Sequence, residues 1–172
     1  MLLKSNTSLL SGFANKYSLV AGITFAMHCE VADLAFTDQN ERLLKNLKPI
    51  AEACNSNILI ECDVSRDASI TKSFSELKEK WPNFDGFVHS IGYAPADQVE
   101  GTFVDVTSRE GFKVAHDISS YSFTAMARES KPRLNERSAV LNLTYLDSVQ
   151  TMQNYNGRGR DKAEVGDNTR WL

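Results

Sequence analysis

The sequence has few cysteines, and their placement narrows the class of protein. Cys29, Cys54 and Cys62 are odd in number and widely spaced, with no Cys-x-x-Cys pair. This pattern argues against a disulfide framework and against a structural zinc site. The three histidines are also scattered, without the spacing of metal ligands. We expect reduced thiols, a cytoplasmic location and no bound metal.

Long hydrophobic runs and an excess of positive charge are lacking as well. Apolar runs such as Ile58–Ile60 are far too short to cross a bilayer. The N-terminal residues Met1–Asn6 do not have the charged-then-apolar build of a signal peptide. The formal net charge of -3 disfavours a nucleic-acid-binding surface. We therefore expect no membrane segment and no nucleic-acid partner.

Short apolar runs alternate with longer helical patterns along all 172 residues. The predicted strands cover Ser8–Ser11, Ala32–Phe36, Asn57–Glu61, Gly86–His89 and Ser138–Leu143. The predicted helices cover Leu19–Glu30, Asn40–Cys54, Asp67–Lys80 and Arg109–Arg128, and a further candidate helix ends the chain. Such alternation predicts right-handed crossovers and a parallel sheet. The prediction is one α/β domain over residues 1–172, a Rossmann-like doubly wound parallel sheet of about five strands.

The turn after the first strand has features of a dinucleotide site. Gly12 allows a tight turn, and Ser18 is a candidate N-cap whose helix amides can bind a pyrophosphate. Gly22 would let the helix approach the sheet closely. The turn is not the common G-x-G-x-x-G, and a glycine after a strand is more often only a turn.

Polar residues follow the second and third strands as well. Asp38 and Gln39 lie where the ribose of an adenosine would bind, and an acidic group there favours NAD over NADP. A solvated turn explains them equally well. Asp63 can reach an adenine edge or cap the loop before the next helix. After the fourth strand, Gly92 gives a flat ligand close access to the backbone.

Several longer phrases carry a family resemblance. They are Gly12-Phe-Ala-Asn-Lys-Tyr-Ser-Leu19, Ala26-Met-His28, Trp81–Pro95 and Arg109–Phe123. Together they resemble the NADH-dependent enoyl-acyl-carrier-protein reductase branch of the short-chain dehydrogenase/reductase superfamily. The resemblance is densest from about Leu9 to Leu146.

The resemblance implies a catalytic set of Tyr145, Tyr155 and Lys162. Tyr155 would hydrogen-bond the enolate oxyanion, Lys162 would hold the nicotinamide ribose, and Tyr145 would face the acyl chain. Seven residues separate Tyr155 from Lys162, which places both on one helix face. The implied NADH contacts are Gly12, Ser18, Leu19, Gln39, Asp63, Val64, Ser90, Gly92 and Lys162. The implied substrate contacts are Tyr93, Ala94 and Tyr145, the substrate is an enoyl thioester on acyl carrier protein, and the assembly is a homotetramer.

The sequence also departs from the family pattern. Val31 replaces a glycine at a left-handed helix end, so we expect that turn to be rebuilt. Asp147 replaces another glycine. The stretch Asn156–Asp161 brings glycines and charges where the family has small and apolar residues. We expect a poorly continued helix around Gly166, and a chain that stops at Leu172 before the family's last two strands and its substrate-covering segment.

Two interpretations follow from these departures. The first is an enoyl thioester reductase that uses NADH. The second is a catalytically inactive, truncated relative that at most binds a nucleotide or a partner subunit. A ketoacyl reductase is a weaker alternative, because that branch places a serine well before its catalytic tyrosine where this chain has Thr144-Tyr145.

Overall fold

A computed structural model describes residues 1–150 and 156–171, and for residues 157–159 it describes the backbone alone. This part of the chain forms two compact units. The first unit combines Met1–Ser90 with Met126–Leu141. The second combines Ile91–Ala125 with the chain from Asn142 onward.

The first unit is built on a five-stranded sheet in the order β3-β2-β1-β4-β5. The strands are β1 (Thr7–Ser11), β2 (Asp33–Asp38), β3 (Leu59–Glu61), β4 (Phe84–His89) and β5 (Leu134–Asn142). β1 pairs in parallel with β2 and β4, and β2 pairs in parallel with β3. The predicted fold class is therefore confirmed. β5 begins at Leu134 rather than at the predicted Ser138, and Asn135 near its start donates a 2.6 Å hydrogen bond to Asp85 of β4.

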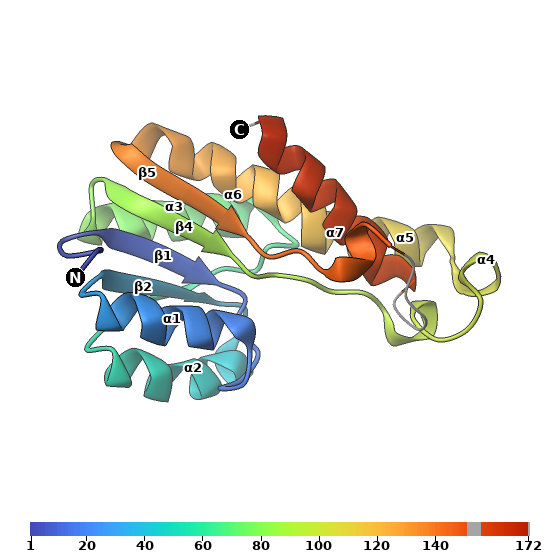
Figure 1. Cartoon of the computed structure of the whole chain (residues 1–172), viewed down its shortest axis with the longest axis horizontal. Helices are drawn as coiled ribbons and strands as arrows, with labels where there is room; N and C mark the ends of the chain where they lie inside the picture. The colour runs from blue at the N-terminus through green and yellow to red at the C-terminus, as the bar shows by residue number, and fades with distance from the viewer. Residues whose placement is uncertain (151–155, 172) are drawn as a thin grey trace. The chain divides into compact units, whose positions relative to one another are not determined.

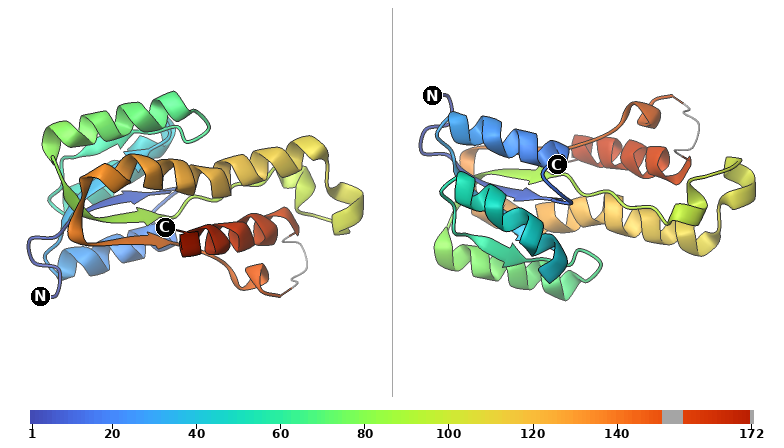
Figure 2. Two further views of the ribbon diagram at one scale, coloured as in Figure 1. Left: turned by 90° about the horizontal axis from the view of Figure 1, so that it is seen from above. Right: turned by 90° about the horizontal axis from the view of Figure 1, so that it is seen from below.

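Helices cover both faces of this sheet. They are α1 (Leu19–Cys29), α2 (Glu41–Ala53) and α3 (Asp67–Lys80), and a single turn at Lys131–Arg133 leads into β5. α1 lies on one face and α3 on the other (Figure 1, Figure 2). The core contains Phe74 of α3, whose ring meets Phe84 at 6.4 Å and Phe87 at 6.5 Å between centroids. The buried face of α3 is therefore the one that the apolar stripe in the sequence predicted.

Two expectations about α1 are wrong. Val31 keeps the left-handed backbone of the family glycine, with a φ of 66°, so the turn is strained and not rebuilt. Its amide still donates to the His28 carbonyl at 2.9 Å, which closes the helix end. Gly22 is exposed, and a methyl group there would meet no atom within 4 Å. It therefore does not bring the helix close to the sheet.

The second unit is helical. It contains short turns at Ala96–Gln98 and Leu146–Ser148, α4 (Phe103–Val106), α5 (Arg109–His116) and α7 (Asn156–Asn168), which a turn at Thr169–Trp171 follows. The predicted helix Arg109–Arg128 has a π-helix at Asp117–Tyr121 between α5 and α6 (Ser122–Ser130). α7 continues through Gly166 to Asn168, so the expectation of a poorly continued helix is wrong.

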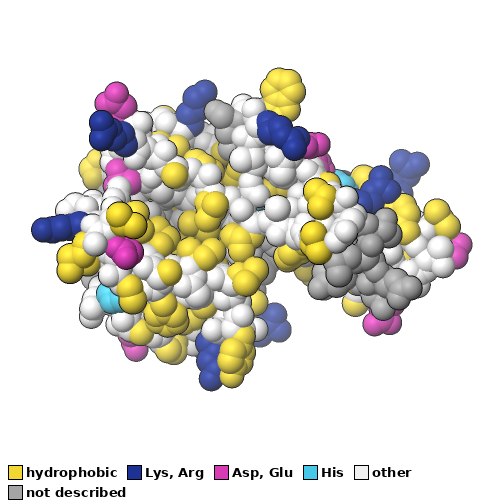
Figure 3. All heavy atoms as spheres, in the orientation of Figure 1, with side chains coloured by type: hydrophobic (Ala, Val, Ile, Leu, Met, Phe, Trp, Pro, Cys, Tyr) yellow, Lys and Arg dark blue, Asp and Glu magenta, His cyan; other side chains and the backbone are white. Residues whose placement is uncertain are grey.

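The described residues include no helix that is both long and apolar enough to span a bilayer. Acidic and basic side chains are scattered among hydrophobic ones over the face in Figure 3, and neither sign forms a single patch there. The three cysteines carry free thiols, with Cys54 and Cys62 buried and Cys29 exposed.

Candidate functional site

In the first unit, four predicted cofactor residues lie just after the ends of neighbouring parallel strands. Gly12 follows β1, Gln39 follows β2 and Ser90 follows β4, while Asp63 comes two residues after β3. Carboxyl ends of parallel strands share one edge of a sheet, which is where doubly wound folds bind their ligands. The Ser90 amide donates to the Ser11 carbonyl at 3.1 Å, so this edge is tied together at its centre.

The turn from β1 into α1 leaves the start of the helix open to an anion. Gly12 has a φ of 97°, which confirms the predicted tight turn. Ser18 is the N-cap residue, but its side chain makes no capping bond and donates instead to the Asn15 carbonyl at 2.6 Å. The first turn holds no acidic residue, and Leu19 is 65% exposed. The positive end of α1 therefore has no side-chain anion of its own.

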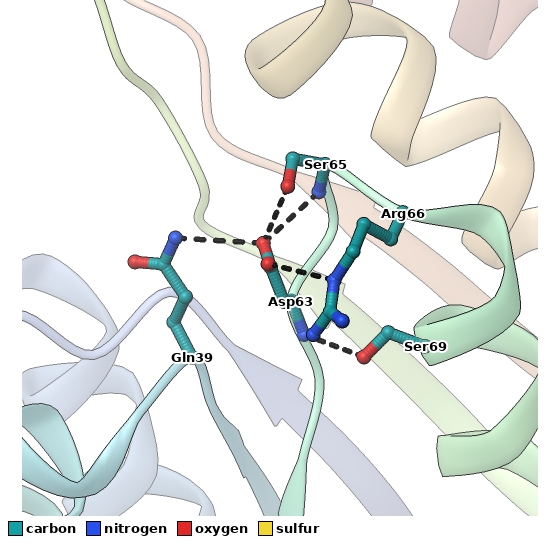
Figure 4. A network of polar contacts seen from close by, with 5 residues as sticks. All are labelled: Gln39, Asp63, Ser65, Arg66 and Ser69. Carbon is teal, nitrogen blue, oxygen red and sulfur yellow. Dashed lines mark hydrogen bonds and ion pairs between the residues drawn. The ribbon is translucent and has the colours of Figure 1, made fainter.

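Asp63 is held by its own loop. Its carboxylate accepts bonds from the Ser65 amide at 3.2 Å, from the Ser65 hydroxyl at 2.8 Å and from Arg66 at 3.1 Å (Figure 4). Gln39 reaches the same carboxylate at 3.5 Å. Partial burial opposes ionisation, but these bonds together hold the pKa of Asp63 below its usual value. The loop-capping interpretation is confirmed, while contact of Asp63 and buried Val64 with an adenine stays a prediction.

Asp38 and Gln39 differ in burial, and this difference bears on the two interpretations of their turn. Gln39 is exposed, as a solvated turn requires, but Asp38 is buried. Burial raises the pKa of Asp38, the Glu61 charge raises it further, and Lys48 opposes both. A second anion here, such as the 2′-phosphate of NADP, would meet this carboxylate and Glu61.

In the second unit, Lys162 of α7 is buried with 2% of its surface exposed. Its ammonium donates to the Ile91 carbonyl at 2.5 Å, and its own carbonyl accepts a bond from the Thr144 hydroxyl at 3.1 Å. Burial lowers the pKa of Lys162, and the neighbouring Asp161 charge opposes that shift. An ammonium has three donors, and within the described part of the chain Ile91 is the hydrogen-bond partner that the Lys162 ammonium has.

Two predicted site residues, Gly92 and Tyr145, lie close to this ammonium. Its nitrogen lies 5.8 Å from the centroid of the Tyr145 ring. A methyl group built on Gly92 would lie 3.1 Å from Lys162 Cε and 3.6 Å from the Tyr145 hydroxyl. A methyl group there would press on the end of the Lys162 side chain, so the backbone at Gly92 comes close to both side chains.

The remaining predicted residues differ in what the structure shows. Tyr93 is 49% exposed and Ala94 is buried beside it in sequence. Tyr155 lies outside the described residues, so its place beside Lys162 stays a prediction. Asp161 is buried with 1% exposed, which fits the expected burial of charge on this helix. Burial raises its pKa to about 6, and a hydrogen bond from Ser119 and the Lys162 charge oppose that rise.

Sequence reasoning missed the partners of Lys162 and Asp161. The Ile91 carbonyl could not be found from residue type, because every residue carries one. Ser119 did carry a signal. It lies with Ser122 on the helical stripe that Phe112 and Ala115 begin, and both serines are buried. Polar residues on a buried stripe need partners, which points to the π-helix as part of the site.

Comparisons with known proteins bear on the family. A sequence profile described as "Enoyl-(Acyl carrier protein) reductase" matches residues 12–172. The chain is 50% identical over 164 residues to "Enoyl-[acyl-carrier-protein] reductase [NADH] FabI" of Escherichia coli K12, which covers 95% of this chain and 63% of that protein. The protein of that name from Salmonella typhimurium is 51% identical over equal shares. The chain thus spans 63% of the length of these curated relatives.

Solved structures give the same family. The enoyl-[acyl-carrier-protein] reductase (NADH) of Aquifex aeolicus VF5 matches with a TM-score of 0.96 and 39% identity, over 100% of this chain and 74% of that one. A reductase from Anaplasma phagocytophilum, solved in complex with NAD, matches with a TM-score of 0.95 and 30% identity, over 99% and 65%. Since the profile and these relatives cover nearly all of the sequence, the chain belongs to the enoyl-(acyl carrier protein) reductase family.

Proposed function

We propose that this chain carries the cofactor and catalytic residues of an NADH-dependent enoyl-acyl-carrier-protein reductase. The reaction is reduction of the trans-2 double bond of an acyl thioester held on acyl carrier protein. The observation that carries the proposal is the convergence of Gly92 and Tyr145 on the buried ammonium of Lys162 in a chain of this family.

The residues at the sheet edge fit a dinucleotide. The uncapped, acid-free start of α1 behind Ser18 and Leu19 suits a pyrophosphate, and Gly12 lets the backbone come close. Gln39 with Asp63 and Val64 would hold the adenosine, and the buried Asp38 favours NADH over NADPH. Ser90, Gly92 and Lys162 would hold the nicotinamide half. When bound, the reduced nicotinamide supplies the hydride that the β-carbon accepts.

The protein's own groups then act on the thioester. Tyr155 would donate a hydrogen bond to the thioester oxygen as negative charge develops on it, and the Lys162 ammonium adds positive potential. The ammonium of Lys162 would fix the ribose, while its bond to Ile91 holds the side chain in place. Tyr93, Ala94 and Tyr145 would line the acyl pocket. A dry, shaped pocket strengthens each of these electrostatic interactions.

The test is oxidation of NADH by the purified chain with a crotonyl thioester as substrate. The absorbance of the reduced nicotinamide follows the reaction. The same assay with NADPH is the matched control. We expect turnover with NADH and much less with NADPH, because Asp38 and Glu61 oppose a 2′-phosphate. Folded protein that binds NADH without turnover would overturn the proposal and leave a nucleotide-binding relative. Equal rates with both cofactors would contradict the assignment of the adenosine end.

We also propose that the chain works as a single dinucleotide-binding domain in a cytoplasmic homotetramer. The family resemblance supports this assembly. Light scattering coupled to gel filtration measures it directly, and a monomer at micromolar concentration would contradict it.

A further inference from the structure

A buried glutamine of the second unit lies on the single turn Ala96–Gln98. Gln98 has 8% of its surface exposed, and its side chain accepts a hydrogen bond from the backbone amide of Ser108 at 2.7 Å. Ser108 is the N-cap residue of α5. Because that amide is a donor, the glutamine atom that meets it is the carbonyl oxygen Oε1. A side chain from a separate turn therefore holds the start of this helix.

This contact completes a capping box that α5 does not complete with its own residues. In such a box the N-cap hydroxyl accepts the amide of the third helical residue, whose side chain in turn accepts the N-cap amide. The first half is present, because the Gly111 amide donates to the Ser108 hydroxyl at 3.0 Å. Gly111 has no side chain for the second half. Gln98 supplies that half from a position ten residues before Ser108.

The glycine at position 111 makes the room that Gln98 occupies. A methyl group built on Gly111 would lie 2.4 Å from Gln98 Cδ, 2.4 Å from its Oε1 and 2.5 Å from its Cγ. Gln98 is buried and hydrogen-bonded, so its amide group cannot move aside without losing the bond to Ser108. Gln98 thus takes the place of the missing side chain of the third helical residue, although a glycine inside a helix lowers its stability.

The segment Tyr93–Gln98 is held by side chains at both of its ends. At the first end, the buried Ser119 hydroxyl accepts from the Tyr93 amide at 2.9 Å and donates to the Tyr93 carbonyl at 3.0 Å. At the second end, the Gln98 amide donates to the Pro95 carbonyl at 3.0 Å, which closes the turn, and the Gln98 side chain binds α5. The four residues between the two ends have no freedom to shift as a unit while both contacts hold.

We propose that Gln98 is a positioning residue, which completes the capping box of α5 from outside the helix and thereby fixes the segment Tyr93–Gln98 against it. The consequence for substrate rests on the proposed function, in which Tyr93 and Ala94 line the acyl pocket. Gln98 acts through these two residues. Its loss therefore weakens binding of the acyl thioester and leaves the hydride step nearly unchanged.

The direct measurement needs neither cofactor nor substrate. Amide hydrogen exchange, resolved by residue with NMR, reports the Ser108 amide that Gln98 accepts and the Gln98 amide that closes the turn. Gln98→Met keeps a long side chain and removes the acceptor. We expect exchange at both amides to become about fivefold faster or more, the effect of losing one hydrogen bond. Unchanged exchange at Ser108 or at residue 98 would overturn the proposal.

A double variant separates the position of the segment from the stability of the helix. Gln98→Ala with Gly111→Gln frees the turn and lets the third helical residue complete the box itself. We expect the Ser108 amide and the urea midpoint to return to the values of the unchanged chain, while the amide of residue 98 still exchanges fast. Gln98→Ala with Gly111→Ala is the matched control, because alanine adds helix propensity without an acceptor. There we expect the Ser108 amide to stay fast.

The kinetic arm tests the link to substrate. We expect the KM for crotonyl thioester to rise about fivefold in Gln98→Met, with kcat nearly level, and to stay raised in the double variant Gln98→Ala with Gly111→Gln. Gln150→Met, at an exposed position of the second unit, is the control and should leave KM unchanged.

The double variant also decides between positioning and a purely structural role. A KM that returns to normal when the capping box is restored within α5 would show that Gln98 serves only the helix, and the positioning role would be wrong. An effect confined to kcat would contradict it as well. If the unchanged chain shows no turnover at all, the proposed function fails, while hydrogen exchange still decides whether Gln98 fixes the segment Tyr93–Gln98.

Discussion

Lys162 is the residue at which the candidate site can be tested most directly. Lys162→Met keeps a long unbranched side chain in the buried position and removes the ammonium that meets Ile91, Gly92 and Tyr145. We expect NADH turnover to fall by about 100-fold or more, the usual effect of losing one preorganised electrostatic group. Steady-state NADH oxidation measures it, and circular dichroism checks the fold. Lys113→Met, at an exposed position on α5, is the control, and a variant that kept a tenth of the activity would contradict the assignment.

For single residues, the sequence predicted the members of the candidate site better than it predicted their hydrogen-bond partners. Tyr145, Gly92 and Lys162 lie together as the family resemblance implied. The sequence could not show that Ile91 offers its carbonyl, because a backbone acceptor carries no signature in residue type. The sequence identified Asp161 as a charge on a helix that the family buries. It could not identify Ser119 as a neighbour of Asp161, because Ser119 lies far earlier in the chain.

The ends of α1 and α2 offer a matched pair of strained positions. Val31 follows the end of α1 with a φ of 66°, and Asn55 follows the end of α2 with a φ of 54°. Glycine pays no steric cost in this region, asparagine pays little and a β-branched residue pays the most. We expect Val31→Gly to raise the free energy of unfolding by about 1 kcal/mol and Asn55→Gly to change it by less than half of that. Urea unfolding measures both, and an equal gain at the two positions would contradict the strain at Val31.

Two glycines in regular elements should respond to alanine in opposite directions. Gly22 lies inside α1 with open space around it, so we expect Gly22→Ala to stabilise the chain by about 1 kcal/mol through helix propensity. Gly86 lies in β4, where an added methyl group would come 2.5 Å from the Ser8 hydroxyl oxygen of β1. We expect Gly86→Ala to destabilise by about 1 to 3 kcal/mol.

The clash at Gly86 has its own control. Ser8→Ala removes the hydroxyl oxygen and leaves its Cβ at 3.4 Å from the added methyl group, which is ordinary contact. The double variant Gly86→Ala with Ser8→Ala should therefore recover most of the lost stability, measured as a coupling in thermal or urea unfolding. Strictly additive effects would show that β1 does not limit the size of residue 86.

For the whole molecule, the alternation of strands and helices sufficed to predict the sheet. Five strand segments separated by helical patterns leave few topologies, and the observed order β3-β2-β1-β4-β5 matches the first five strands of the doubly wound form with the order 3-2-1-4-5-6. The break in the helix Arg109–Arg128 could not be predicted, because a π-turn changes neither the composition nor the apolar stripe. The assignment of residues 1–172 to one domain stays a prediction.

The free energy of unfolding of the whole chain should depend on pH because Asp161 is buried. The folded state raises the pKa of Asp161 to about 6, above the usual value of 3.8, so it binds a proton more tightly than the unfolded state. Stability then falls as pH rises from about 4 to about 6, and at neutral pH the ionised acid costs about 2 to 3 kcal/mol. Asp63 and Asp85 have lowered pKa values, so their contribution is lost only at more acidic pH.

Asp161→Asn removes this term and keeps the shape of the side chain. We expect it to unfold at higher urea concentration than the unchanged chain at pH 7.5, and we expect a clearly smaller difference at pH 4.5. Asp167→Asn, at an exposed position of the same helix, should follow the unchanged chain at both pH values. The raised pKa of Asp38 has the same sign and stays in every variant, so only the difference between the Asp161→Asn and Asp167→Asn curves measures Asp161. A difference that is equal at the two pH values would show that the carboxyl group does not titrate between them.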